Sequence, residues 1–160
     1  MPTPIGDLIV REAQPGDAER ICALLARLRL GIDHVLAPGT RYWLAEGAGG
    51  QVAGVVGLEY GAEDVLLRSA AVDPPARGRA IGAALVREAL ESAARAGYRR
   101  AYLFSTGAGP YWVRLGFREV PVPQLVAALP DAPQVRRYEE LGWLPTEVAW
   151  VLELDGERMS

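Results

Sequence analysis

The stretch LLRSAAVDP (66–74) is followed, after two residues, by RGRAIGA (77–83). The first segment is mostly apolar, and the proline at its end predicts that a strand stops there, because proline lacks the N–H that a sheet needs and favours an extended residue before it. From Ile81 onward, apolar residues recur at helical spacing to about Ala96, and Gly97 is typical of the residue just past a helix end. The stretch therefore predicts a strand, a tight turn and a helix.

The turn carries features of an anion site. Gly78 and Gly82 lie where the helix opens, Arg77 and Arg79 add positive charge, and the first N–H groups of a helix have no internal partner. A residue without Cβ lets a phosphate approach such N–H groups closely. The alternative is a helix that simply begins with glycines and surface arginines, and spacing alone leaves both open. The pattern is neither a Walker A loop nor G-x-G-x-x-G.

From Leu66 to Phe117 the chain resembles the core of the GCN5-related N-acetyltransferases (GNAT). RGRAIG (77–82) is similar to the family signature [Q/R]-x-x-G-x-[G/A], with Ala80 in place of the fourth-position glycine. The extra methyl group narrows the approach of a phosphate. YWVRLGF (111–117) is similar to the family's aromatic–Tyr-x-x-x-Gly-Phe. The resemblance covers about half of the chain directly.

The resemblance implies an α/β (α+β) single-domain GNAT fold. Its central sheet is mixed and mostly antiparallel, with about seven strands, flanking helices and a helical insertion before the last strand. It also implies acetyl-CoA as cosubstrate, with the pyrophosphate held by backbone N–H groups of the turn and the thioester carbonyl bonded by the N–H of Val72 beside a β-bulge. The residues implied to bind acetyl-CoA are Ala70, Ala71, Val72, Arg77, Gly78, Arg79, Ala80, Ile81, Gly82 and Ala83.

Proton handling is where the sequence departs from the family. The tyrosine that often protonates the departing thiolate is replaced by Trp112, whose indole cannot do so. Tyr111 is the candidate acid, although neighbours on a helix point about 100° apart. Ser105 and Thr106 are further donors that could act through water.

Two carboxylates are candidate general bases, and three other residues are candidate substrate contacts. Glu59 and Glu46 lie on predicted strands, and for each the alternative is a solvated surface carboxylate. Side chains alternate along a strand, so one of Arg68 and Ser69 is expected in the cleft. An arginine there suits a substrate with an oxyanion, the alternative being an arginine at the solvent edge. His34 lies near the loop that borders the acceptor site in the family, and its alternative is a structural role.

Composition limits the classes of protein. The 160 residues, half of them hydrophobic and 23% charged, predict one domain over 1–160, and the net charge of −3 argues against nucleic acid as a partner. One cysteine, Cys22, allows no internal disulfide, and with a single histidine it cannot build a Cys/His zinc site, so no metal is expected. Without an apolar membrane span or signal-peptide pattern, we expect a cytoplasmic protein. We also expect a monomer or a homodimer.

The other predicted elements follow the order of the resembled family. Strands are expected over 8–12, 40–46, 51–61, 100–105, 117–120 and 148–154, helices after Asp17 and from Pro110, and a short helix over 32–36. The segment 121–146 is rich in proline and holds two short helical patterns, 124–129 and 135–141. This insertion is expected to cover the acceptor end of the sheet.

These observations predict an enzyme that transfers acetyl from acetyl-CoA to the amine of a small molecule. One alternative is a module that holds acyl-CoA without turnover, which Ala80 and Trp112 favour. Another is a protein N-acetyltransferase, against which the long insertion argues because it would close a peptide groove. Arg68-Ser69, the replaced tyrosine and the proline-rich end are also similar to acetyltransferase-like proteins found with bacterial arsenic-resistance genes.

Overall fold

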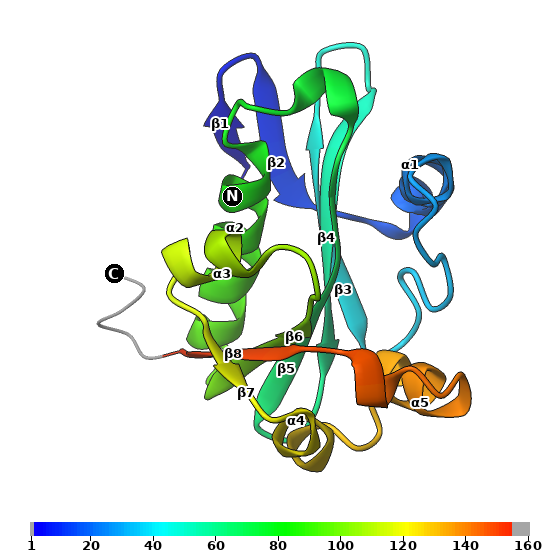
Figure 1. Cartoon of the computed structure of the whole chain (residues 1–160). Helices are drawn as coiled ribbons and strands as arrows, with labels where there is room; N and C mark the ends of the chain where they lie inside the picture. Colours follow the sequence, from blue (N-terminus) through cyan, green and yellow to red (C-terminus); the bar gives the residue numbers. More distant parts are fainter. Residues whose placement is uncertain (1, 155–160) are drawn as a thin grey trace. The chain divides into compact units, whose positions relative to one another are not determined.

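The computed structural model describes residues 2–154, and in this range eight strands hydrogen-bond in the order β1-β2-β3-β4-β5-β6-β8-β7 (Figure 1). The β1/β2, β2/β3, β6/β8 and β7/β8 pairs are antiparallel, and β5/β6 is parallel. The strands are β1 (Thr3–Ile5), β2 (Leu8–Glu12), β3 (Thr40–Glu46), β4 (Val52–Tyr60), β5 (Asp64–Val72), β6 (Arg100–Phe104), β7 (Arg118–Val120) and β8 (Ala149–Glu153). The predicted α/β fold with a mixed, mostly antiparallel sheet is confirmed. The sheet has eight strands in the described range instead of about seven, because β1 was not predicted.

Helices connect most of these strands. They are α1 (Ala18–Arg27), α2 (Ile81–Arg95), α3 (Gly109–Arg114), α4 (Val122–Ala128) and α5 (Pro133–Glu140), with single 3₁₀ turns η1 (Pro15–Asp17), η2 (Pro74–Ala76) and η3 (Leu144–Thr146). Gly97 ends α2 with φ of 93°, as predicted for a residue past a helix end. In the described range no helix is both long and apolar enough to cross a membrane.

The chain divides into two compact units. The first comprises the chain up to Leu58 together with Ser69–Leu90, and the second comprises Glu59–Arg68 together with the chain from Glu91 onward. Strands β4 and β5 and helix α2 each contribute residues to both units.

The first unit has a core between α1 and the strands. Ile21, Leu24 and Leu25 of α1 are buried against residues that include Tyr42 of β3. A Cβ on Gly57 would lie 2.5 Å from the Tyr42 ring, so only glycine fits there. A glycine within a strand often marks such a close approach to the backbone, here by the Tyr42 ring.

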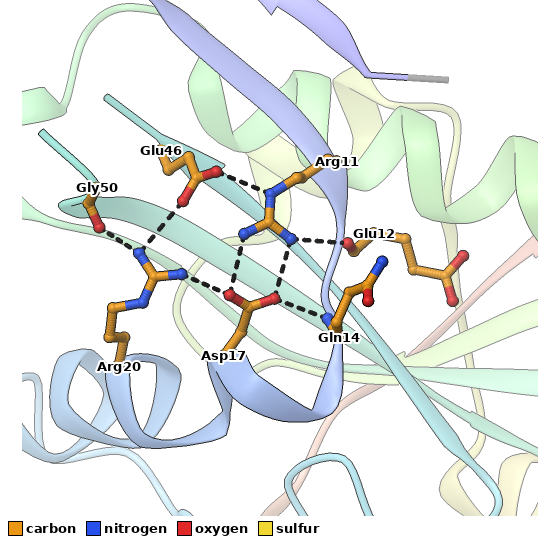
Figure 2. A network of polar contacts seen from close by, with 7 residues as sticks. All are labelled: Arg11, Glu12, Gln14, Asp17, Arg20, Glu46 and Gly50. Carbon is orange, nitrogen blue, oxygen red and sulfur yellow. Dashed lines mark hydrogen bonds and ion pairs between the residues drawn. The ribbon is translucent and has the colours of Figure 1, made fainter. Parts of the chain in front are cut away.

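A charged network joins the start of α1 to the neighbouring strands (Figure 2). The Asp17 carboxylate accepts bonds from both terminal nitrogens of Arg11, each 2.9 Å, and from Arg20, while Glu46 accepts from Nε of Arg11 at 2.8 Å. Asp17 is the residue before α1, as predicted, but its carboxylate bonds the arginines and the N–H of Gln14 instead of capping α1. The Arg11 guanidinium holds the pKa of Asp17 well below its usual range.

The second unit has a core to which the insertion contributes. Leu125, Leu129 and Val135, from the segment between β7 and β8, are buried together with Leu66 of β5 and Tyr102 of β6. Helices α4 and α5, drawn yellow to orange in Figure 1, are therefore part of the folded core and not a surface appendage.

The predicted helix over 32–36 is wrong. Residues 33–36 form turns, and within them His34 and Leu36 have φ of 67° and 56°. These left-handed values cannot continue a right-handed helix. The chain needs a change of direction here, between α1 and β3, which hydrophobic spacing does not reveal.

Candidate functional site

The turn between β5 and α2 is the first candidate site. After η2 the chain passes through Gly78 and Ala80, with φ of 83° and 59°, before α2 begins at Ile81. Left-handed residues in a turn direct neighbouring N–H groups into an anion-binding concavity. Residues 77–80 are exposed, so the backbone there is open to a ligand. The first N–H groups of α2 follow directly and have no partner within the helix.

Ala80 stands where the family signature has glycine, and its backbone has the left-handed conformation that glycine adopts most easily. An L-residue in the left-handed region costs about 1–2 kcal/mol relative to its usual conformation, and glycine does not pay this cost. The Ala80 carbonyl accepts the N–H of Ala84 at 3.2 Å, so this strained residue also starts the hydrogen-bond ladder of α2. The turn thus retains a glycine-like conformation without the glycine.

The two arginines of the turn are held differently. Nε of Arg77 donates to the carbonyl of Val72 at 3.1 Å, at an exposed position. Arg79 donates through Nη2 to the carboxylate of Asp7, and this bond is the main cause that lowers the pKa of Asp7. The charge of Arg79 is therefore partly balanced by an acidic partner, which the sequence analysis did not foresee.

Strand β5 is irregular near its middle. Its parallel register with β6 joins Asp64 to Arg100 and Leu66 to Tyr102, and further along Ser69 has φ of 57°. A left-handed residue within a strand interrupts the extended conformation, as a β-bulge does. The Ser69 hydroxyl lies 3.4 Å from the hydroxyl of Tyr42, and Ala70 is exposed.

Glu59 and Arg68 form a buried ion pair. Glu59 is 0% exposed and Arg68 9%, and Nη1 of Arg68 lies 2.6 Å from Oε2 of Glu59. The other oxygen of Glu59 accepts the backbone N–H of Gln134, at the start of α5, at 3.0 Å. The alternatives of a solvated Glu59 and of an arginine at the solvent edge are both wrong. The charge of Arg68 is already balanced, which weakens the expectation that it recognises a substrate oxyanion.

Tyr111 and Trp112 lie together on α3. The Tyr111 ring stands edge-on to Trp112 with centroids 4.9 Å apart, and the Arg114 guanidinium lies 6.0 Å from the Tyr111 ring. Burial raises the pKa of Tyr111, and Arg114 counteracts this in part. Trp112 is buried against Phe117, and its Nε1 has no hydrogen-bond partner among the described residues.

Three further residues predicted for the site, Glu46, His34 and Ser105, make contacts with other parts of the chain. Glu46 belongs to the Arg11–Asp17 network, where the hydrogen bond from Arg11 lowers its pKa, so it is a poor proton acceptor. His34 is an exposed turn residue whose carbonyl accepts the N–H of Ala37. The carbonyl of Ser105 accepts the indole N–H of Trp150 at 2.9 Å.

Sequence reasoning missed an aromatic and polar cluster in the insertion. Tyr138 of α5 packs between Phe104 and Trp143, with centroids 5.2 Å from each. Gln134 Nε2 lies 3.4 Å from the Tyr138 hydroxyl. Burial raises the pKa of Tyr138, with Glu147 as the next cause, and burial also raises the pKa of Glu147. The available signal was two aromatic residues in a proline-rich segment, five positions apart.

Comparison with known proteins identifies the family. The family model described as "Acetyltransferase (GNAT) domain" matches residues 38–119, just over half of the chain. The chain belongs to the GNAT acetyltransferase family. The matched range contains the turn and α3, whereas the insertion lies after it. No curated protein matches the chain significantly.

Solved structures share the fold at low identity. A GNAT acetyltransferase from Staphylococcus aureus has a TM-score of 0.73 and 17% identity, over 92% of this chain and 99% of its own. A GNAT N-acetyltransferase from Escherichia coli, solved with CoA, has a TM-score of 0.68 and 22% identity, over 99% and 87%. Spermidine N-acetyltransferase from Vibrio cholerae, solved with CoA and spermine, has a TM-score of 0.55 and 20% identity, over 71% and 82%.

Proposed function

We propose that this GNAT protein transfers the acetyl group of acetyl-CoA to the amine of a small-molecule acceptor, acting as one domain over 1–160. The observation that carries the proposal is the turn with two left-handed residues, Gly78 and Ala80, immediately before α2. Such a turn supplies backbone N–H groups and the positive end of a helix dipole to a diphosphate. Related folds solved with CoA support the same ligand.

The chemistry requires an amine nitrogen to attack the thioester carbonyl carbon. The C–S bond breaks, the amine loses a proton, and the thiolate of CoA gains one. We propose that the residues 70–72 and 77–83 hold the cosubstrate, with the N–H of Val72 bonding the thioester oxygen. Acetyl-CoA supplies the activated acyl group, and the chain supplies position and hydrogen bonds.

Tyr111 remains the proposed proton donor to the thiolate. Glu59 is a weaker proposal for the base than the sequence made it, because both of its oxygens already accept hydrogen bonds. The residues Arg68, Ser69 and His34 remain proposed acceptor contacts, of which Arg68 is the one already paired. A cytoplasmic location and kinship with the arsenic-associated proteins also remain proposals.

The test is CoA binding by calorimetry for Gly82→Asp, with Gly31→Asp as the matched control. Gly82 lies in the first turn of α2, where an aspartate favours the helix dipole, so we expect the variant to fold while charge and bulk oppose the phosphates; circular dichroism checks the fold. Gly31 has open space around it and adds the same side chain elsewhere. We expect Gly82→Asp to abolish binding and Gly31→Asp to retain it; equal affinity of the two would remove the turn from the proposal.

A second candidate function is an acyl-CoA-binding module without turnover. The observation that favours it is Trp112, a buried indole at the position of the usual tyrosine. Transfer of radiolabelled acetyl to members of an amine panel distinguishes the two. Normal CoA affinity without transfer to any acceptor would favour the module.

A further inference from the structure

The cluster in the insertion combines aromatic surface with acceptor atoms. Trp143 is 48% exposed although its ring packs on Tyr138, so a large aromatic residue is partly open to a ligand. The backbone fixes this arrangement, because the N–H of Trp143 donates to the carbonyl of Tyr138 at 2.9 Å and the following η3 turn is closed by the N–H of Glu147 on the carbonyl of Leu144 at 3.2 Å. These two bonds fix the backbone before and after Trp143, from Tyr138 to Glu147.

The charge of the cluster favours a cation. Glu147 is half-buried, and the influences on its pKa are burial and the backbone N–H of Val148, with no cation among them. Within the described range no Lys or Arg ion pair involves its carboxylate. The nearby Arg68 is neutralised by Glu59, so it leaves the net charge of the cluster negative.

The polar atoms of the cluster include several hydrogen-bond acceptors. Oε1 of Gln134 is buried and has no partner among the described residues. The carboxylate of Glu147 accepts only, and the hydroxyl of Tyr138 can accept as well as donate. An ammonium group has three donors and no acceptor, and it is attracted to the face of an indole ring. A carboxylate ligand would meet a carboxylate and an unpaired carbonyl oxygen instead.

We propose that Tyr138, Trp143 and Glu147 form a binding site for the ammonium group of a small-molecule amine that carries no neighbouring acidic group. All three residues belong to the second unit, so this inference goes beyond the proposed function and does not depend on it.

The experiment compares two ligands of similar shape and opposite charge, 2-phenylethylamine and 3-phenylpropionate, titrated into the full chain at pH 7 and followed by tryptophan fluorescence and NMR. We expect the amine to bind at least about 10-fold more tightly than the acid, since each favourable charged contact is worth roughly a factor of this size. Equal affinity for both ligands would overturn the proposal.

Variants locate the site. Glu147→Gln and Trp143→Leu should each weaken amine binding about 10-fold, whereas Glu140→Gln removes an exposed carboxylate from α5 and should change it less than about 2-fold. Equal losses in Glu147→Gln and Glu140→Gln would overturn the site. CoA affinity is measured on the same samples: intact CoA binding without amine discrimination overturns only this inference, and absent CoA binding in the unmodified chain overturns the proposed function.

Discussion

Replacing Ala80 with glycine tests the geometry of the turn before α2. At φ of 59° an alanine costs about 1–2 kcal/mol, and glycine releases that cost. Glycine also makes the unfolded chain more flexible, which costs about 0.4–1 kcal/mol. The difference predicts that Ala80→Gly stabilises the protein by about 0–1.6 kcal/mol, against the usual direction of an alanine-to-glycine change.

Ala84→Gly is the matched control, because Ala84 is in the same helix one turn later and bonds to the Ala80 carbonyl. There the change should destabilise by about 0.8–1 kcal/mol. Urea unfolding followed by circular dichroism gives both free energies of unfolding, and those of the two variants should differ by at least about 0.8 kcal/mol. If both variants lose the same stability, Ala80 is not left-handed in solution and the proposed phosphate turn loses its geometry.

Three further changes probe other contacts. Asp17→Asn should lower the free energy of unfolding by about 1.5–3 kcal/mol at pH 7, because it removes the charge that bonds Arg11. Since the pKa of Asp17 is lowered in the folded state, the stability that the carboxylate contributes is present above its unfolded pKa of about 3.9 and is lost as the pH falls further. Identical acid unfolding of the variant and the unmodified protein would contradict the network. Glu59→Gln should lower the free energy of unfolding by about 3–5 kcal/mol because Arg68 stays buried without its counter-ion, and an unchanged melting temperature would show that the pair is not buried in solution. Tyr111→Phe should lower kcat of acetyl transfer by about 100-fold, because it removes the proposed proton donor to the thiolate, whereas a loss within about 3-fold would show that Tyr111 is not the acid.

Local signals predicted most of the elements. The strand, turn and helix between Leu66 and Gly97 appear where proline, glycine and apolar spacing placed them, because each of these signals acts over a few neighbouring residues. Strand β1 was missed because three residues with a central proline carry no alternation, and it exists by pairing Thr3–Ile5 with β2. The turn at 33–36 was missed for the converse reason, since apolar spacing continued where the backbone reversed.

The amino-acid sequence by itself determined the GNAT family and the strand, turn and helix between Leu66 and Gly97, because both depend on short runs of neighbouring residues. Only the tertiary structure decided that Glu59 and Arg68 are buried against each other and that α5 closes over them through the N–H of Gln134. These partners come from β4, β5 and the insertion, and no periodicity links them. Charge pairing and burial depend on which segments meet in space, so the tertiary structure alone shows that Arg68 is paired with Glu59 and that no arginine among residues 2–154 forms an ion pair with Glu147.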